Sequence, residues 1–322
     1  MITILLDNKN GNVWDLSQIA GDVTWKTSRI GRAGSLEFTV VTEGLYQSRA
    51  FSINNGDIVQ VRYGDKPVFH GYIFTLEGGS GETVKVKAYD QIRYLMASDT
   101  FIFKNKRASE IIVEVANKFK LKTGYIETTP YLIPEMVEDG KKLLDICNKA
   151  LDLTLIHGGK NYVLYDDFGA LTLRNIEDMV ADNYLGEGSL LTDYSTSLSI
   201  DQDTYNRIVL YQDNKKTGNR ELYIEQDAET IAKWGMLQLY QSVDEKKNEG
   251  QIGELLKMLS TLHNRESKTM KLNALGDLQV RAGSYIYVVI ERLGLNQPFL
   301  VDECSHKFSG ALHTMALDVK VI

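Results

Sequence analysis

A stretch near the C-terminal end of this chain has a counterpart near its start, and this internal similarity constrains the fold more than any other feature. Residues 298–319 align on residues 67–88 without a gap. The alignment places a proline, a glycine and a threonine on their equivalents: Pro67 on Pro298, Gly79 on Gly310, and Thr83 on Thr314. Such a repeat indicates two copies of one supersecondary unit.

Both copies have the residue pattern of paired β-strands. Apolar residues alternate with other residues over 84–88 and over 315–319. A period of two is typical of a half-buried strand. Each copy follows another strand candidate that opens with glycine and a small polar residue, Gly56-Asp57 in the first and Gly283-Ser284 in the second. We therefore predict two similar small antiparallel β-modules, one at each end of the chain.

The composition is that of a folded protein rich in antiparallel strands. Of the 322 residues, 43% are hydrophobic and 25% charged, which excludes wholesale disorder and suggests about two or three domains. The chain has 4 prolines, 26 glycines and 17 tyrosines, a balance that favours aromatic strands joined by tight turns. The net charge of -7 argues against nonspecific attraction to nucleic acid.

The sequence predicts neither membrane insertion nor export. Its longest apolar run, at residues 285–290, is far shorter than the roughly twenty residues needed to cross a bilayer. Met1 leads directly into a strand-like segment at residues 2–6, so we predict no export signal. Cys147 and Cys304 lie far apart in apolar segments, and we interpret them as reduced core residues of a protein made in a reducing cytoplasm.

Residue periodicity divides the chain into three predicted segments, and the fold class we predict is a β-rich α+β protein. Residues 1–100 form the first β-module, with strands at 2–6, 23–27, 35–41, 58–63, 68–76 and 83–89 and a hairpin turn at 78–81. Residues 101–190 form an α+β insert, with an amphipathic helix from residue 106, a helix at 141–151 and strands at 153–157, 161–165 and 170–173.

The third segment, residues 191–322, is predicted to be the second β-module. Its strands fall at 197–200, 207–211, 221–225, 269–274 and 278–280, followed by the repeat, and a polar hairpin lies at 213–219. A helical insertion is predicted at about residues 244–265, because apolar residues recur there at helical spacing.

Residue types that hold metals or phosphates are present without the required spacing. The histidines are scattered at His70, His157, His263, His306 and His313. His306 and His313 fall in one predicted hairpin that can bring them together, but no third ligand joins them at zinc-site spacing. Glycine clusters at residues 31–34 and 158–161 adjoin strands rather than opening a helix, so they predict turns instead of phosphate loops. We predict no metal and no cofactor.

Acidic residues likewise give no catalytic pattern. Asp201, Asp203 and Asn206 partly resemble a calcium loop, but the required glycine and closing glutamate are missing, so we predict a polar turn. Acidic pairs at residues 166–167 and at 225 and 227 carry no sign of the burial that shifts a carboxyl pKa. A Gly-x-Ser-x-Gly motif is absent from the sequence. We predict no catalytic residues.

Aromatic residues of the first module suggest a different possibility, a ligand groove of a carbohydrate-binding module. The residues concerned are Trp25, Tyr63, Phe69, Tyr72 and Phe74. Aromatic residues on alternating strands more commonly belong to the core or to the surface of a sheet. The sheet interpretation is therefore favoured.

Five short segments spread along the chain together match the pattern of a known protein family. They comprise the Gly56-Asp57 opening and residues 88–95 (AYDQIRYL), 104–111 (KNKRASEI), 205–208 (YNRI) and 313–317 (HTMAL). Together these segments resemble the XkdQ-type baseplate hub proteins, which belong to contractile tails of phages, defective prophages and R-type bacteriocins. The resemblance covers essentially the whole chain, although none of its motifs is catalytic.

The resemblance implies a homotrimeric ring at the tip of a contractile injection system. In such hubs, two similar β-barrel domains per subunit alternate around the ring, so the trimer presents a pseudo-sixfold surface. That surface joins the hexameric tail tube to the trimeric spike. The implied partners are therefore the tube protein, the spike protein and other baseplate proteins, with no specific nucleic-acid binding and no membrane insertion. Assembly would take place in the host bacterial cytoplasm, and the mature location would be the tail baseplate of a virion or bacteriocin.

Free strand edges supply a physical mechanism for this assembly, because unpaired edges can pair with a neighbouring module. We expect the terminal strands, at residues 2–6 and 314–322, to provide such edges. Two other functions stay open at this point. One is a tail-associated cell-wall hydrolase, which needs a catalytic constellation, and the other is a carbohydrate- or receptor-binding tail module that uses the aromatic residues.

Overall fold

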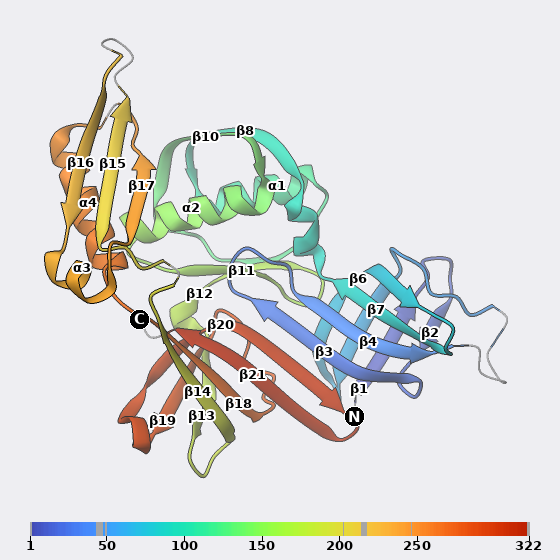
Figure 1. Ribbon diagram of the computed structural model, residues 1–322. Helices are drawn as coiled ribbons and strands as arrows, with labels where there is room; N and C mark the ends of the chain where they lie inside the picture. Colours follow the sequence, from blue (N-terminus) through green and yellow to red (C-terminus); the bar gives the residue numbers. More distant parts are fainter. Residues whose placement is uncertain are drawn as a thin grey trace. The chain divides into compact units, whose positions relative to one another are not determined.

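A computed structural model describes residues 2–42, 48, 50–201, 203–213, 218–245 and 247–320 (Figure 1). Antiparallel strands dominate it, with few helices, as the sequence predicts for the fold class. The chain divides into two compact units, one of Met1–Ser195 with Lys271–Ile322 and the other of Thr196–Met270. The three-segment division inferred from periodicity stays a prediction. None of the described helices is long and apolar enough to cross a membrane.

The first β-module is built from seven consecutive strands. They are β1 (Ile2–Asp7), β2 (Val13–Asp15), β3 (Ala20–Ser28), β4 (Ser35–Val41), β5 (Ile58–Tyr63), β6 (Lys66–Gly78) and β7 (Thr83–Tyr89). On β4, Leu36, Phe38 and Val40 are buried, as the alternating pattern predicts. They pack in one apolar core with residues of the neighbouring strands, among them Ile4 and Val86.

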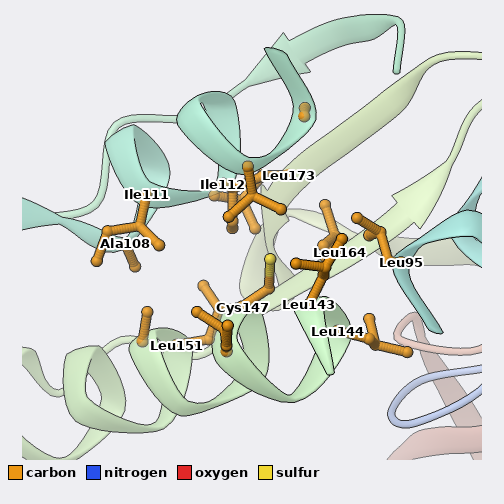
Figure 2. Close-up of a cluster of buried hydrophobic side chains, with 14 of the residues drawn as sticks. Leu95, Ala108, Ile111, Ile112, Leu143, Leu144, Cys147, Leu151, Leu164 and Leu173 are labelled. Carbon is orange, nitrogen blue, oxygen red and sulfur yellow. The ribbon is translucent and has the colours of Figure 1, made fainter. Parts of the chain in front are cut away.

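An α+β insert follows the first module. Its elements are a 3-10 helix η1 (Gln91–Met96), β8 (Ser98–Arg107), α1 (Ala108–Lys118), β9 (Thr123–Ile126), β10 (Leu132–Lys142), α2 (Leu143–Gly158), β11 (Tyr162–Asp166) and β12 (Leu171–Asn175). Figure 2 shows apolar side chains of α1 and α2 pointing toward one another, including Ile112 and Cys147, which are buried. The core position predicted for Cys147 is therefore confirmed.

The insert also corrects a predicted strand. Residues 153–157 belong to α2, which ends only where Gly159 adopts a left-handed backbone (φ 68°) and donates its N–H to the carbonyl of Leu155. A short apolar run is compatible with either a strand or a helix. Here the run continues α2, whose earlier turns are buried in the core of the insert, while Leu155 and Ile156 are exposed. The long pair β8–β10 has no counterpart in the prediction, because charged residues interrupt its alternation.

The second β-module uses strands from both sides of Thr196–Met270. Its elements are a 3-10 helix η2 (Ile176–Asp178), β13 (Val180–Gly186), β14 (Leu191–Ser199), β18 (Ser267–Leu275), β19 (Tyr285–Ile290), a 3-10 helix η3 (Glu291–Leu293), β20 (Leu295–Ser309) and β21 (Leu312–Lys320). The strand predicted at residues 278–280 is wrong, since these residues form a turn that places Val280 in the core.

The unit of Thr196–Met270 has its own small core. Its elements are β15 (Arg207–Asp213), β16 (Arg220–Gln226), α3 (Ala228–Trp234), β17 (Gln238–Ser242) and α4 (Glu249–His263). Ile252 and Leu256 of α4 pack on Ile208 and Leu210 of β15, so the predicted helical stripe is confirmed. β15 and β16 pair up to Asp213 and Arg220, as the predicted hairpin requires, although residues 214–217 lie outside the described residues.

The two modules belong to one sheet of 13 strands, whose main path runs β14-β18-β21-β20-β3-β4-β7-β6-β5-β1-β2. In Figure 1 β20 and β21 run side by side, with β3 on the other side of β20. The path formed by the described strands is open. The arrangement of the two modules as two β-barrels therefore stays a prediction.

The two halves of the repeat open with the same turn. In the first module, the N–H of Asp57 donates to the carbonyl of Asn54 (3.2 Å), and Asp57 Oδ2 accepts the N–H of Asn54 (2.8 Å). In the second, Ser284 makes the equivalent two bonds with Arg281, at 3.1 Å and 3.2 Å. Side-chain oxygens thus close both turns in the same way.

The glycine of each turn anchors it to the next strand. Gly56 and Gly283 have φ values of 90° and 89°, a left-handed conformation that glycine adopts without strain. The N–H of Gly56 donates to the carbonyl of Ile73 (2.7 Å), and the N–H of Gly283 donates to that of Val301 (2.9 Å). Ile73 and Val301 are therefore equivalent, and the repeat of β5-β6-β7 as β19-β20-β21 is confirmed.

This equivalence corrects part of the gapless alignment. Each long strand has a bulge directly after the anchored residue, at Phe74 in β6 and at Asp302 in β20. The alignment places Ile73 on Cys304 and is therefore wrong for this strand. It is right for β7 and β21, where Ala88 and Val319 face the anchored residues. The second hairpin is longer, and a gapless alignment cannot absorb that difference.

Because Ser284 does in the second module what Asp57 does in the first, we expect Asp57→Ser to be tolerated better than Asp57→Ala. The alanine variant leaves the N–H of Asn54 and the amide of Asn8 without their acceptor, which costs about 1–3 kcal/mol in free energy of unfolding. Urea unfolding of both variants measures the difference. Equal losses would contradict the equivalence of the two turns.

Candidate functional site

The two modules meet where β3 pairs with β20. The pairing is antiparallel and runs from Ser28 opposite Glu303 to Val23 opposite Phe308. It occupies the edge of β20 away from β21, directly after the bulge at Asp302. β19 occupies the same edge before the bulge, so β20 changes partner at this point.

Side chains reinforce this module junction. Trp25 of β3 stacks on His306 of β20, with ring centroids 5.0 Å apart and planes 18° apart. Arg29 forms an ion pair with Asp302 at 2.9 Å, and its N–H donates to the carbonyl of Asp302 (2.9 Å). Thr27 Oγ1 accepts the buried N–H of Ala282 (3.0 Å). The junction is thus held by backbone, aromatic and ionic contacts together.

His306 is fully buried in this junction as a neutral ring. Its Nε2 lies 2.8 Å from the carbonyl of Val280 and therefore donates its proton there. Its Nδ1 lies 2.9 Å from Nε2 of His313 and therefore accepts. Burial lowers the pKa of His306 to about 4, and the neighbouring His313 acts in the same direction. The predicted proximity of these two histidines is confirmed.

A second buried polar group connects the insert to both modules. Asp90 accepts the N–H groups of Gly34 (2.9 Å) and Ile92 (3.0 Å), and burial raises its pKa well above the usual range. Burial also raises the pKa of Asp166, whose Oδ1 accepts the N–H of Gly169 (2.6 Å). The positive charge of Arg281, whose guanidinium stacks 3.8 Å from the Tyr165 ring, opposes both shifts.

This environment is what the sequence missed at Asp166, for which it predicted no burial. The carboxyl group is buried, and no residue pattern around Asp166-Asp167 predicts this burial. At the neighbouring Asp90, the backbone of Gly34 packs so closely that a side chain at position 34 would collide with the carboxyl Oδ2. Asp90, Asp166 and Arg281 come from three different segments of the same compact unit. We therefore interpret their interactions as structural packing between these segments.

The five aromatic residues considered for a ligand groove do not form a single surface. Trp25 and Phe69 are buried in the first-module core, and Tyr63 packs on Phe308. Phe74 packs on Tyr89 (5.5 Å between centroids). Of these five aromatic residues, Tyr72 alone lines the cleft of about 610 Å³ beside His70 and Phe168. The sheet interpretation is the one that these contacts support.

The other sequence candidates have structural roles where they are described. Asn206 bridges Gly235 and Leu237 through its side-chain amide. Asp227 caps α3, and the amide of Asn264 together with backbone N–H groups lowers its pKa. No cluster of three or more metal-ligating side chains occurs among the described residues. Residue 202, within the calcium-loop candidate, lies outside them.

Strand edges are the remaining candidate surfaces, and most of the expected terminal edges are paired on both sides among the described residues. β1 pairs with β5 on one side and with β2 on the other. β21 likewise lies between β20 and β18. Tertiary pairing therefore covers Leu5–Asp7 of β1 and the described part of β21 on both sides, and residues 321–322 of the expected edge lie outside the described residues.

Of the backbone edges without a strand partner among the described residues, two are related to the β3–β20 junction. One is the side of β14 that faces away from β18, at one end of the sheet path. The other is the part of β6 after its bulge, residues 75–78, on the side where β5 pairs before the bulge. Unpaired N–H and C=O groups in such edges are templates for pairing with another strand.

This fold is one that phage-type tail proteins adopt. The prophage MuSo2 43 kDa tail protein from Shewanella oneidensis superimposes with a TM-score of 0.70 and 15% identity, over 98% of each chain. A tail protein from Neisseria meningitidis superimposes with a TM-score of 0.67 and 12% identity, over 99% of this chain and 96% of that one.

The chain belongs to the YQBQ-like family, whose sequence profile matches residues 23–320. It is 31% identical to the phage-like element PBSX protein XkdQ of Bacillus subtilis over 308 residues, which cover 94% of this chain and 93% of that protein. It is 32% identical to YqbQ of the same organism over 272 residues, which cover 84% and 82%. The resemblance to XkdQ-type proteins is therefore confirmed.

Proposed function

We propose that this protein is a structural baseplate hub of a contractile tail. In this proposal three copies form a ring in which two β-barrel modules per chain alternate, giving a pseudo-sixfold surface. The ring joins the hexameric tail tube to the trimeric spike and contacts other baseplate proteins. Assembly takes place in the host bacterial cytoplasm, and the final location is the baseplate of a virion, or of a headless particle such as an R-type bacteriocin.

The observation that carries this proposal is the duplicated hydrogen-bond plan of the two modules. Gly56-Asp57 and Gly283-Ser284 open equivalent three-stranded units, and one β-strand pairing, β3 with β20, joins them within the chain. A duplicated module suits a position between sixfold and threefold partners, since closed rotational symmetry repeats each interface around the ring. The YQBQ-like family and the tail-protein fold support the same role.

The proposed role is non-enzymatic. The buried carboxyl groups of Asp90 and Asp166 pack between elements, and the relatives that the chain matches include a protein of a phage-like element. A lytic band in cell-wall zymography that a single substitution abolishes would contradict this part of the proposal.

The mass of the purified protein in solution is the first test. Light scattering over a concentration series should yield about three times the chain mass of 36.3 kDa for the protein alone, or, after addition of spike protein, the mass of a complex that contains three of these chains. Pull-down with tube and spike proteins should then recover both. A protein that remains monomeric with both partners present, and binds neither, would overturn the proposal.

A further inference from the structure

The first module has an edge equivalent to the one that β20 uses to pair with β3, and this edge has no partner strand among the described residues. β20 pairs with β3 over residues 303–308, directly after the bulge at Asp302. The equivalent part of β6 follows the bulge at Phe74, where residues 75–78 pair with β7 on one side. On the other side, no strand among the described residues takes the place that β3 takes on β20.

A strand equivalent to β3 is also present, and its corresponding edge is open. β3 pairs with β4, which pairs with β7; β14 pairs with β18, which pairs with β21. β7 and β21 are the equivalent strands of the repeat. β14 therefore stands in the second module where β3 stands in the first, and it ends the sheet path with an unpaired edge in the described part of the chain.

Hydrogen bonds fix the direction of β14. Leu190 accepts from the N–H of Leu275 at 2.9 Å, and Thr192 Oγ1 donates to the carbonyl of Asn273 at 2.9 Å. At the opposite end, Ser267 Oγ donates to the carbonyl of Ser199 (2.9 Å). β14 thus runs antiparallel to β18, just as β3 runs antiparallel to β4.

We propose that β14 of one subunit pairs antiparallel with residues 75–78 of β6 in a second copy, repeating between chains the β3–β20 pairing found within the chain. This inference deepens the proposed hub function and rests on it. The contact is heterologous, since each subunit offers two different edges, and such contacts close into a ring when the rotation allows. Each subunit then gives one edge to each neighbour.

A second copy fits these edges better than an unrelated partner. Within one chain, β14 and β6 are separated on the sheet path by β18, β21, β20, β3, β4 and β7. The sequence of β14, LTDYSTSLS, lacks the lysines and prolines that commonly protect an edge strand and has Asp193 as its one charge. Leu198 on this strand is 64% exposed. These features suit a strand that is covered on assembly.

Disulfide trapping tests the pairing. One set of chains carries a single cysteine on β14, by Ser195→Cys, Thr196→Cys or Ser197→Cys, at exposed positions. The other set carries Thr75→Cys or Glu77→Cys on β6. The two native cysteines are buried, so they should not react with the introduced thiols. Mixing one chain of each set under mild oxidation should yield a covalent dimer for at least one of the combinations.

The matched controls separate this contact from others. Each single-cysteine chain alone should stay at the chain mass on a denaturing gel, because a heterologous contact does not bring identical residues together. A Val13→Cys chain, on β2 at the other end of the sheet path, should not link to a β14 cysteine. A chain with both cysteines should give covalent trimers.

The outcomes distinguish the inference from the function on which it rests. If light scattering shows a trimer and no β14–β6 combination forms a covalent dimer, the strand pairing is wrong and the hub proposal stands. If linking to Val13→Cys equals that to the β6 cysteines, the pairing is also wrong. If the protein stays monomeric with tube and spike present, the hub proposal itself fails.

Discussion

Replacing Phe308 by alanine is expected to lower the free energy of unfolding by about 3–5 kcal/mol. Phe308 lies on β20 of the second module, yet its buried ring belongs to the core of the first module. It packs on Tyr63 with 5.6 Å between ring centroids and on His313 with 4.3 Å. The substitution therefore leaves a cavity in one module by changing a residue of the other.

Urea denaturation followed by tryptophan fluorescence measures this loss. Leu312→Ala is the matched control, since Leu312 lies in the same hairpin and is 56% exposed. A surface change of this kind usually alters stability by less than about 0.5 kcal/mol. If both variants lose the same small amount of stability, the ring of Phe308 does not contribute to the core of the first module.

Acidification is expected to destabilise the module junction through His306. Its pKa is about 4 in the folded protein, against an unfolded value of 6.5, so the unfolded state binds the proton more readily. The contribution of His306 to stability is therefore complete above pH 6.5 and is lost as the pH falls from 6.5 toward 4. A shift of this size corresponds to about 3 kcal/mol.

Other titratable groups also contribute to the pH dependence of stability, so the effect of His306 must be measured by comparison with a variant. Burial also lowers the pKa values of His313 and His70, which adds to the acid loss, whereas the raised pKa values of Asp90 and Asp166 act in the opposite direction. The contribution of His306 is therefore the difference in pH dependence between the wild type and His306→Gln. Glutamine is neutral and retains a donor for the carbonyl of Val280.

The measurement is the free energy of unfolding at several pH values between 7 and 4 for both proteins. We expect the glutamine variant to be less stable at pH 7 but to lose less stability on acidification. Parallel pH curves for the two proteins would show that His306 does not titrate in this window.

In the repeat, residue patterns predicted which strands are equivalent but not the register of every strand. Alternating apolar residues correctly identified β7 and β21 as equivalents, because a half-buried strand must place every second side chain in the core. The same alignment misplaced Ile73 on Cys304. Bulges and hairpin length shift register without leaving a clear mark in hydrophobicity, so hydrogen bonds were needed to assign the equivalents.

Among the candidate site residues and surfaces, local features were likewise predicted and features that depend on distant residues were not. The proximity of His306 and His313 followed from their positions in one hairpin, which is a local property. The burial of Asp166 did not, because the charged and polar groups that interact with it belong to His70, Asp90 and Arg281, far away in the chain. The open edges were misassigned to the chain ends for the same reason, since strand order depends on partners distant in sequence.

By itself, the sequence determined the β-rich class, the duplicated unit with its Gly56-Asp57 and Gly283-Ser284 openings, helix α1, and the resemblance that family membership confirms. These are recorded in local periodicity, in turn chemistry and in similarity to relatives. Only the tertiary structure decided which edges pair, where the bulges fall and which polar groups are buried. Each of these depends on contacts between residues far apart in the chain, and the free energy of such contacts leaves no local pattern.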